Sequence, residues 1–382
     1  MAKQIFTPMP AKIKAIGIGG GGCNAITRMV REGIKGVEFA VMNTDGQALT
    51  LAEASTRIQL GEKLTKGLGA GGDHHIGAKA AEESHQIIEE FIEGADMVFV
   101  AAGMGGGTGT GGIPVVTEIA KETGALTIAV VTKPFVFEGK HRSEVAEEGI
   151  IKLHDKVDTL IIIPNDRLMH LCDAKTTIDN AFKLADDALL LGVQAISEVV
   201  TIPGLINLDF ADIKSVMRDA GPAWMSVGKA NGQNRAVEAA KSALASPLLD
   251  VSVAGARGVL FNITGGPSLT LFECNEAADI IRQGVDPRAN IIFGVVFDPR
   301  MDSEVRITVI ATGFTSQYGK GATTTEELRR LLKEGETLDV PSFLRRAQNV
   351  PSSHLGVNSQ AHIMASSKVS GITLHPPKIS RQ

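Results

Sequence analysis

Two glycine-rich segments, each preceded by a short apolar run and followed by a longer helix-like stretch, constrain the fold of this chain most strongly. The first reads GIGGGGCNA at residues 17–25 and follows the run KIKAIGI at 12–18. The second reads GMGGGTGTGG at 103–112 and follows DMVFVAA at 96–102. Glycine lets a backbone approach an anion closely, and the start of a helix offers unpaired N–H groups and the positive end of the helix dipole. Each segment therefore predicts a strand–loop–helix unit that binds phosphate.

The first loop, taken alone, leaves the ligand ambiguous. Gly17, Gly19 and Gly22 stand at the G-x-G-x-x-G spacing of a dinucleotide-binding turn, and Asp45 follows the second apolar run. This pattern keeps a Rossmann NAD-dependent oxidoreductase open as an alternative. The second loop, which contains two threonine hydroxyls, favours a polyphosphate held from two sides. Neither loop is a Walker A motif, because no Gly-Lys-Ser/Thr follows.

The N-terminal part, residues 12–175, is predicted to be an α/β domain. Short apolar runs at 12–18, 37–43, 96–102, 126–132 and 159–164 alternate with longer helix-like stretches. Uninterrupted apolar strands separated by helices indicate a mostly parallel sheet that is covered on both faces. The stretch 176–200 lacks proline, starts with a Thr-x-x-Asp cap signal at Thr176 and is apolar round most of its circumference. It predicts a long, buried central helix, which at ~1.5 Å per residue spans about 36 Å and connects two domains.

The following part, residues 201–316, is predicted to be a smaller C-terminal α+β domain. Two helical segments at 235–244 and 269–284 precede two apolar runs at 290–299 and 303–312. The five residues around the Asp298-Pro299 step resemble a turn, so the two runs predict a strand pair.

Composition and charge argue against several classes of function. A net charge of −5 and an aromatic content of 4% disfavour nucleic acid as a ligand. No apolar run approaches the roughly 18 residues of a membrane-spanning helix, so direct membrane insertion is not expected. The segment 1–11, predicted to be flexible, lacks the apolar core of a secretion signal. Three scattered cysteines match neither a disulfide framework nor a metal site, so a cytoplasmic location is expected.

Five separated motifs, taken in order, resemble the tubulin superfamily and within it the FtsZ family of bacterial cell-division GTPases. Three of them add to the glycine loops: KPFVFEGKHR at 133–142, PNDRLM at 164–169 and GLINLDFADI at 204–213. The similarity implies a tubulin-like GTPase fold that binds GTP or GDP with Mg²⁺ and hydrolyses GTP. It also implies head-to-tail polymerisation into filaments of the division ring at mid-cell.

The resemblance further implies a set of nucleotide-binding residues. Glu138 and Arg142 would flank the ribose and phosphates, and the base pocket would be formed by Asn165, Phe182 and Asp186. Mg²⁺ would be held through the phosphates, with Thr108 as its candidate side-chain ligand. The residues implied for the phosphate loops are Gly20, Gly21, Gly22, Asn24, Gly103, Gly105, Gly106, Gly107, Thr108, Gly109 and Thr110.

For some of these residues, a structural role is an alternative to the implied role in nucleotide binding. Glu138 and Arg142, spaced i and i+4, also fit a solvated helix contact. Asp186 is a carboxylate inside an apolar helix, and the N1–H and N2–H₂ groups of guanine would satisfy it. The alternative is a solvent-facing position next to Asp187. No metal is expected at His74-His75, because adjacent side chains rarely reach one ion.

The resemblance assigns hydrolysis to Asn207, Asp209 and Asp212. An amide and two carboxylates this close in sequence can orient a water and carry a cation, although helix capping is an alternative role for Asp212. Because Asp186 lies about 13 residues before the end of the predicted helix, these carboxylates are on the order of 20 Å from the base pocket. We therefore expect them to complete the site of the next subunit in a head-to-tail contact, which makes filaments when it does not close. Their presence argues against a non-hydrolysing tubulin-like scaffold, the third alternative.

The remaining residues cannot build a core, and they divide into three predicted parts. Residues 317–337 predict a short linker, with a flexible span of about 25 Å. The motif LDVPSFLRR at 338–346 resembles the family's docking peptide for membrane-tethering and regulatory division proteins. Residues 347–382, with three basic and no acidic side chains, predict a basic disordered tail.

Overall fold

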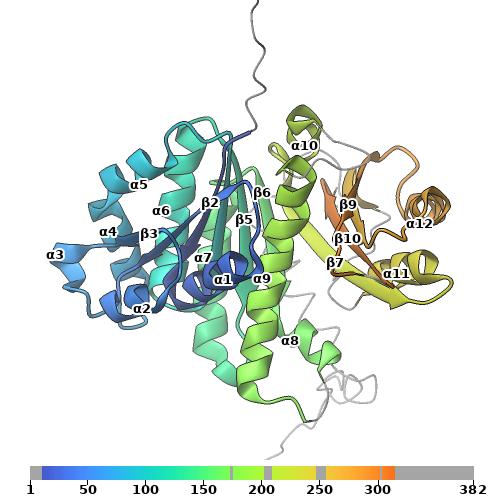
Figure 1. Cartoon of the computed structure of the whole chain (residues 1–382). Helices are drawn as coiled ribbons and strands as arrows, with labels where there is room; N and C mark the ends of the chain where they lie inside the picture. Colours follow the sequence, from blue (N-terminus) through green and yellow to red (C-terminus); the bar gives the residue numbers. More distant parts are fainter. Residues whose placement is uncertain (1–10, 173–174, 202–208, 247–254, 302, 315–382) are drawn as a thin grey trace, which may run out of the picture. The chain divides into compact units, whose positions relative to one another are not determined.

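The computed structural model describes residues 11–172, 175–201, 209–246, 255–301 and 303–314, all within the compact unit Met1–Gly335. The strands of these residues form a ten-stranded sheet in the order β3-β2-β1-β4-β5-β6-β7-β10-β8-β9 (Figure 1). The strands are β1 Ile13–Ile18, β2 Val37–Asn43, β3 Thr56–Gln59, β4 Met97–Gly103, β5 Leu126–Lys133, β6 Thr159–Pro164, β7 Gly221–Asn231, β8 Gly258–Gly265, β9 Asn290–Phe297 and β10 Glu304–Thr312. The predicted linker, docking peptide and tail, and residues 1–10 of the predicted flexible segment, lie outside the described residues.

The first six strands are parallel, as the uninterrupted apolar runs predicted. Two apolar clusters cover the two faces of this half of the sheet. One contains side chains of α1 Gly19–Glu32, α9 Ile178–Thr201 and α10 Phe210–Met217. The other contains side chains of α4 His74–Glu83, α5 His85–Ile92, α6 Thr108–Glu122 and α7 Lys140–His154. A sheet with helices on both faces is the α/β architecture that the sequence predicted.

Both glycine loops leave the same edge of the sheet, because β1 and β4 are parallel neighbours. Ile18, the last residue of β1, is in register with Ala102 on β4. The loop after β1 leads directly into α1, and the loop after β4 leads into α6. Between β2 and β4 the chain passes through α2 Gly46–Leu51, β3, α3 Glu62–Thr65, α4 and α5, so the sheet order reverses at β1. Ligands of open α/β sheets bind at such a reversal, at the carboxyl ends of the strands.

The long helix α9 crosses the sheet in the middle of the described chain. It begins at Ile178, and Thr177 rather than Thr176 is its first capping side chain, because Thr177 Oγ1 accepts a hydrogen bond from Asn180 N. Its buried residues pack against β5 and α1. The small residue Gly36, just before β2, lies against Thr201 at the other end of the helix. The helix therefore runs from the carboxyl edge of the sheet to the amino edge.

The C-terminal part continues the same sheet. β7 pairs with β6 through Thr159–Gly221 and two further pairs, and β10 then pairs antiparallel with both β7 and β8. The helices α11 Arg235–Leu244 and α12 Leu271–Gly284 pack together over this part. The predicted strand pair at 290–299 and 303–312 was wrong. Both segments are strands, but β9 pairs in parallel with β8 and is separated from β10 by that strand.

Candidate functional site

The first glycine loop brings the start of α1 close to the second loop. A side chain on Gly17 would meet the Gly22 carbonyl oxygen at 2.2 Å, and one on Gly22 would meet the Ala101 carbonyl oxygen at 2.4 Å, so both glycines allow close packing. At Gly20, by contrast, an added Cβ has nothing within 4 Å. The N-cap residue Ile18 supplies no side-chain hydrogen bond. The first N–H groups of α1 therefore face open space without a side-chain acceptor, which suits an anion.

The second loop has the same character at the start of α6. Its N-cap Gly107 supplies no side-chain hydrogen bond, and Gly106 has open space where a Cβ would stand. The Thr110 hydroxyl is buried and accepts a hydrogen bond from Gly105 N at 2.8 Å, which holds the loop together. Thr108 Oγ1 lies 2.6 Å from Thr44 Oγ1, the residue after β2. Thr108 therefore carries the hydroxyl at the mouth of the loop, and Thr44 is a contact that the sequence analysis missed.

A third glycine segment, residues 69–73, borders the second loop and was also missed. An added Cβ on Gly107 would meet Ala70 Cβ at 2.9 Å and the Asp73 backbone at 3.1 Å. Gly69, Gly71 and Gly72 all have positive φ, so this segment presents its backbone in a conformation that glycine favours. The signal was present as a glycine-rich run before His74, but it does not follow a strand.

The base side of the site is a cavity of about 380 Å³ between α1, α2 and α9. Its wall contains four of the residues implied for the nucleotide: Gly20, Asn24, Phe182 and Asp186. Phe182 is partly exposed and stands edge-on to Phe135, with ring centroids 5.5 Å apart. The remaining lining residues are Cys23, Thr27, Arg28, Arg31, Ala48, Leu51, Ala52, Asp179 and Lys183. A planar heterocycle fits a site with an aromatic wall and a carboxylate.

Asp186 is the partly buried acid of this cavity. Burial raises the pKa of its carboxyl to about 7, the nearby Arg28 guanidinium opposes that rise, and the negative charge of Asp187 adds to it. Burial also raises the pKa of Asp187, which forms an ion pair with Arg28. The alternative of a solvent-facing position therefore fits Asp187 better than Asp186. Arg28 and Asp187 were not among the predicted site residues.

Glu138 and Arg142 lie beside the second loop and form an ion pair, but not the solvated helix contact of the alternative, because the Glu138 side chain is buried and precedes α7, which carries Arg142. Glu138 Oε2 is 3.1 Å from Arg142 Nη1, and Glu138 Oε1 accepts a hydrogen bond from Phe135 N at 2.8 Å. An added Cβ on Gly105 would meet the Arg142 carbonyl oxygen at 2.7 Å, which places this pair next to the loop. The half-exposed guanidinium remains able to reach a phosphate.

Asn165, the first residue of α8 Asn165–Leu168, follows the carboxyl end of β6. Its side chain is buried, and its Oδ1 has no hydrogen-bond partner among the described residues. A buried acceptor of this kind is costly unless a ligand or water satisfies it. This agrees with a position at the base pocket, although Asn165 does not line the cavity between α1, α2 and α9.

The acidic pair Asp209 and Asp212 lies at the opposite edge of the sheet. Both side chains are exposed at the start of α10, and Asp209 makes no side-chain cap. At the other end of α10, the Met217 carbonyl accepts a hydrogen bond from the hydroxyl of Thr159, the first residue of β6. The six residues of β6 separate this end from the edge where the glycine loops emerge, a length of about 20 Å. Asn207 lies outside the described residues.

Two other features bear on the alternatives. Asp45 caps α2 by accepting hydrogen bonds from Gln47 N and Ala48 N, so the carboxylate required for a dinucleotide ribose is already engaged. The ligand atoms of Asp73, His74 and His75 lie within 4.8 Å of one another, closer than adjacent side chains usually come. Asp73 accepts a hydrogen bond from His75 N as the cap of α4, and His74 Nε2 faces Glu148 at 3.7 Å. Among the described residues, His74 Nε2 is buried and has no hydrogen-bond partner.

Comparison with known families gives two matches that together cover most of the described chain. Residues 12–173 match the Tubulin/FtsZ family, GTPase domain, and residues 221–315 match the FtsZ family, C-terminal domain. No helix among the described residues has the length and apolar character needed to cross a membrane.

Comparison with solved structures points in the same direction. An FtsZ from M. jannaschii, described as an empty dimer, is 46% identical, with 80% of this chain and 89% of that chain covered and a TM-score of 0.78. A tryptophan-to-tyrosine variant of FtsZ from M. jannaschii has the same identity and TM-score, with 80% of this chain and 92% of that chain covered. CetZ2 from Haloferax volcanii, described as a GTPγS-bound protofilament, is 18% identical, covers 86% of this chain and 100% of that chain, and has a TM-score of 0.68. At that identity the likeness extends to the fold alone.

Proposed function

The chain belongs to the FtsZ family of tubulin-like GTPases, and from this premise we propose that it hydrolyses GTP at head-to-tail contacts between its own copies. The observation that carries the proposal is the separation of two half-sites. The glycine loops and the base cavity occupy the carboxyl edge of the sheet, whereas the exposed Asp209 and Asp212 occupy the amino edge. One copy cannot bring the two halves together, but two copies stacked edge to edge can.

GTP would bind with its phosphates over the starts of α1 and α6. The unpaired N–H groups of both helices, and the open space at Gly20 and Gly106, support this placement. The base would enter the cavity, stack against Phe182 and donate its N1–H and N2–H₂ hydrogens to Asp186. Adenine lacks that pair of donors, so guanine is the better fit.

Mg²⁺ would bind mainly through phosphate oxygens. The hydroxyl of Thr108, at the mouth of the second loop, is an oxygen donor of the kind that a small hard cation accepts. The ion would neutralise charge on the transferring phosphate and orient its oxygens. The Glu138–Arg142 pair would place a second positive charge near the phosphates.

Hydrolysis would use the acidic pair of the neighbouring copy. A carboxylate of Asp209 or Asp212 would orient a water toward the terminal phosphorus and accept its proton as the bond forms. Asn207 of the neighbouring copy would act together with these two carboxylates. A contact that joins opposite edges of identical subunits is heterologous, and where the rotation between subunits does not close a ring it builds a filament.

We further propose that these filaments form the division ring at mid-cell, in the cytoplasm. Residues 338–346 would dock on membrane-tethering and regulatory division proteins, and the 347–382 extension would follow this peptide. The support is the sequence motif and the family membership.

A mixing experiment tests the two-copy site. Gly106→Val puts a side chain into the open space of the second loop without a clash, so it should fold and fail to bind GTP. Asp212→Asn should bind GTP and hydrolyse it poorly. Because each variant keeps the half-site that the other lacks, an equimolar mixture should hydrolyse GTP faster than the sum of the two alone. Phosphate release is measured over a range of protein concentrations, with sedimentation in GTP and in GDP alongside.

The matched control is Glu122→Gln, which removes an exposed carboxylate at the end of α6. It should hydrolyse GTP like the wild type. The proposal fails if the two folded variants show no gain on mixing, or if wild-type turnover per molecule is independent of concentration from the dilute range upward.

A further inference from the structure

One face of α1 carries polar side chains at four-residue spacing along the base cavity. Gly20, Asn24 and Arg28 line the cavity in turn, and Glu32 follows one helical turn later. Opposite this face, α9 contributes Asp186 to the same cavity. Arg28 is therefore the cation of this face that stands nearest to the partly buried acid.

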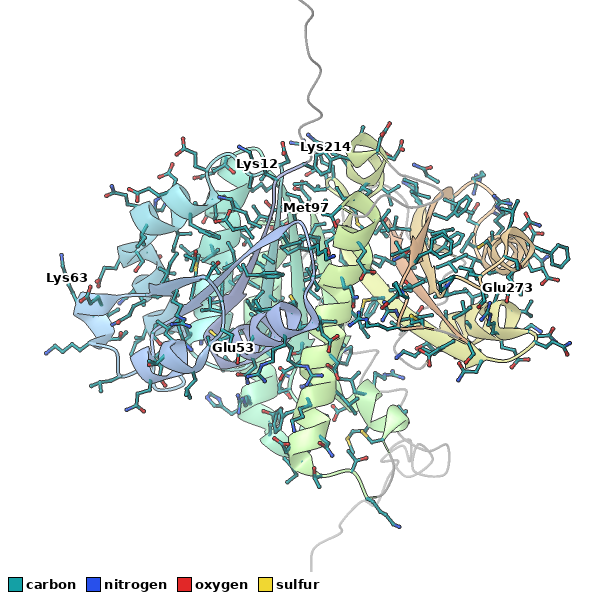
Figure 2. The ribbon with its side chains drawn as sticks, in the orientation of Figure 1. Lys12, Glu53, Lys63, Met97, Lys214 and Glu273 are labelled. Carbon is teal, nitrogen blue, oxygen red and sulfur yellow. The ribbon has the colours of Figure 1, made fainter. Side chains whose placement is uncertain are left out.

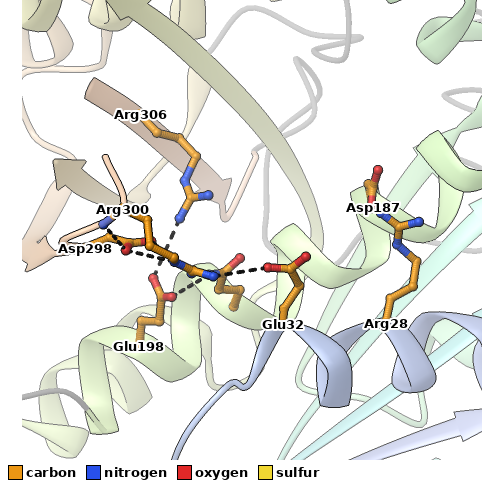
Figure 3. Close-up of polar contacts among 8 residues, drawn as sticks. Arg28, Glu32, Asp187, Glu198, Asp298, Arg300 and Arg306 are labelled. Atoms are coloured by element: carbon orange, nitrogen blue, oxygen red, sulfur yellow. Dashed lines mark hydrogen bonds and ion pairs between the residues drawn. The ribbon is translucent and has the colours of Figure 1, made fainter. Parts of the chain in front are cut away.

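Arg28 bridges α1 and α9. Its Nη2 pairs with Asp187 Oδ1 (Figure 3), and its Nε is buried without a hydrogen-bond partner among the described residues. Both side chains are about one-third exposed, at 32% and 36%. Ion pairs with this much solvent contact contribute little to folding stability. A reason for the pair is better sought in the cavity that it borders.

Of the two neighbouring acids of α9, Asp187 raises the pKa of Asp186 through its negative charge. Asp186 and Asp187 are consecutive, and burial makes the charged form of each carboxyl less favourable. The positive charge of Arg28 is the largest opposing influence on both. The same guanidinium thus forms an ion pair with Asp187 and, through its positive charge, favours the ionised form of Asp186.

Other charged groups around the cavity are already paired. Arg31 forms an ion pair with Glu53, which lies outside the lining, and Lys183 forms one with Asp179, which also lines the cavity. α2 contributes only apolar residues to the lining. The more distant influences on Asp187 are Glu32 on α1 and Lys229 on β7. Of all these groups, Arg28 is the cation that acts on Asp186.

We propose that Arg28 is the positioning residue that sets base specificity: its positive charge, in the wall of the cavity that Asp186 also lines, favours the ionised form of Asp186 that accepts the hydrogens of guanine. This inference rests on the proposed binding of a guanine nucleotide. An ionised carboxylate accepts both the N1–H and the N2–H₂ hydrogens of guanine. A protonated carboxyl offers one donor and one acceptor, which matches N1 and the N6 amino group of adenine instead. The protonation state of Asp186 therefore decides whether the site matches guanine or adenine.

The experiment measures GDP and ADP affinity as a function of pH for the full chain and its variants, at concentrations too low for assembly. With Arg28 present, Asp186 has a pKa of about 7, so GDP binding should weaken as pH falls through neutrality. In Arg28→Gln the positive charge near Asp186 is lost, so the midpoint of GDP binding against pH should rise by about one pH unit. GDP binding to this variant should be roughly fivefold weaker than to the wild type at pH 7 and equal to it near pH 9.5. The ratio of ADP to GDP affinity should rise at pH 7. Titration of the ligand phosphate is common to all variants and cancels in the comparison.

A second variant moves the midpoint in the opposite direction. Asp187→Asn removes the neighbouring negative charge and leaves Arg28 facing Asp186, so the midpoint should fall below that of the wild type. Lys35→Gln, which removes an exposed positive charge just beyond α1, should leave the midpoint in place. Thermal unfolding without nucleotide checks that each variant is folded.

The outcomes separate this inference from the proposed function. If the wild type binds neither GDP nor GTP, the proposed function fails first. If the wild type binds GDP but Arg28→Gln weakens it by the same factor at every pH, Arg28 has only a structural role and the inference is overturned. A midpoint that rises in Asp187→Asn overturns it as well.

Discussion

At the scale of single residues, the glycines of the first loop have two different physical roles. Gly22 lies where α1 approaches the end of β4, and a Cβ there would stand 2.4 Å from the Ala101 carbonyl oxygen. Gly20 lies on the open side, with nothing within 4 Å of the same position. Packing therefore requires glycine at position 22, and the approach of an anion requires glycine at position 20.

This difference predicts opposite effects of two alanine substitutions. Gly22→Ala should lower the free energy of unfolding by about 1–3 kcal/mol, because backbone atoms must move to admit the methyl group. Gly20→Ala should leave stability unchanged or raise it by up to about 1 kcal/mol, because alanine favours the helix more than glycine does. The same change should weaken GDP binding by crowding the phosphates. Urea unfolding and GDP titration of both variants check this, and equal destabilisation by the two changes would contradict it.

The residues of the site differ in how far the sequence could predict them. The glycine loops were predictable because strand, glycines and helix are contiguous, and Asp186 stood out as an acid within an apolar helix. The Arg28–Asp187 pair was not, because it depends on how α1 packs across α9. Arginine on a helix is an ordinary surface residue until the facing helix is known.

At the scale of elements, α12 shows how a cap determines where a helix begins. The sequence pattern predicts that this helix begins at Leu269, whereas it begins at Leu271 because Thr270 is its N-cap. Thr270 Oγ1 accepts a hydrogen bond from Glu273 N at 3.2 Å, and Glu273 Oε2 accepts one from Thr270 N at 2.9 Å. Glu273 also pairs with the buried Arg235 of α11 at 2.8 Å. The cap thus holds the acid that joins the two helices.

We expect Thr270→Ala to lower the free energy of unfolding by about 1 kcal/mol, since a helix N–H loses its acceptor. Thr270→Ser keeps the hydroxyl and should recover most of that loss. Urea unfolding of the two variants measures the difference. Equal stability of the serine and alanine variants would show that the hydroxyl is not what stabilises the start of α12.

The pairing of the C-terminal strands could not be derived from the sequence. β7 contains glycine, proline and alternating small residues, and β8 has too short an apolar run to distinguish a strand from a buried helix. Because the sequence pattern does not predict β7 and β8, it predicts that β9 and β10 pair with each other. β10 instead lies between β7 and β8, which requires contacts between segments far apart in the sequence. Local patterns predict that a strand exists but not its neighbour.

At the scale of the whole described molecule, whose side chains Figure 2 draws, a group of charged side chains joins the two halves of the sheet (Figure 3). Arg300, after β9, contacts Glu32 at the end of α1 at 3.4 Å and Asp298 at 3.0 Å. Arg306 on β10 lies 3.9 Å from Glu198 on α9. The α1 helix that carries Arg28 at the cavity therefore also contacts the C-terminal strands. Ion pairs that connect elements in this way make the stability of the junction dependent on pH.

Glu198 gives this dependence a definite sign. Burial raises the pKa of its carboxyl above the ordinary range, opposed by a hydrogen bond from Gln194 and the charge of Arg306. Because the pKa of Glu198 is higher in the folded state than in the unfolded state, the protonated carboxyl favours folding. This stabilisation is complete only below the pKa of glutamate in the unfolded chain, about 4.3. That contribution is lost as pH rises through the folded value. The wild type should therefore lose stability relative to Glu198→Gln as pH increases from 5 to 8.

Thermal unfolding of both proteins across this range measures the difference, in which about 1 kcal/mol corresponds to roughly 1–2 °C for a chain of this size. Glu198→Gln also removes the partner of Arg306, but that guanidinium stays charged throughout, so its cost shifts the whole curve without changing the slope. Gln194→Met removes the amide that stabilises the ionised carboxylate, and it should steepen the loss. A difference between the wild type and Glu198→Gln that stays constant from pH 5 to 8 would mean that the junction does not titrate.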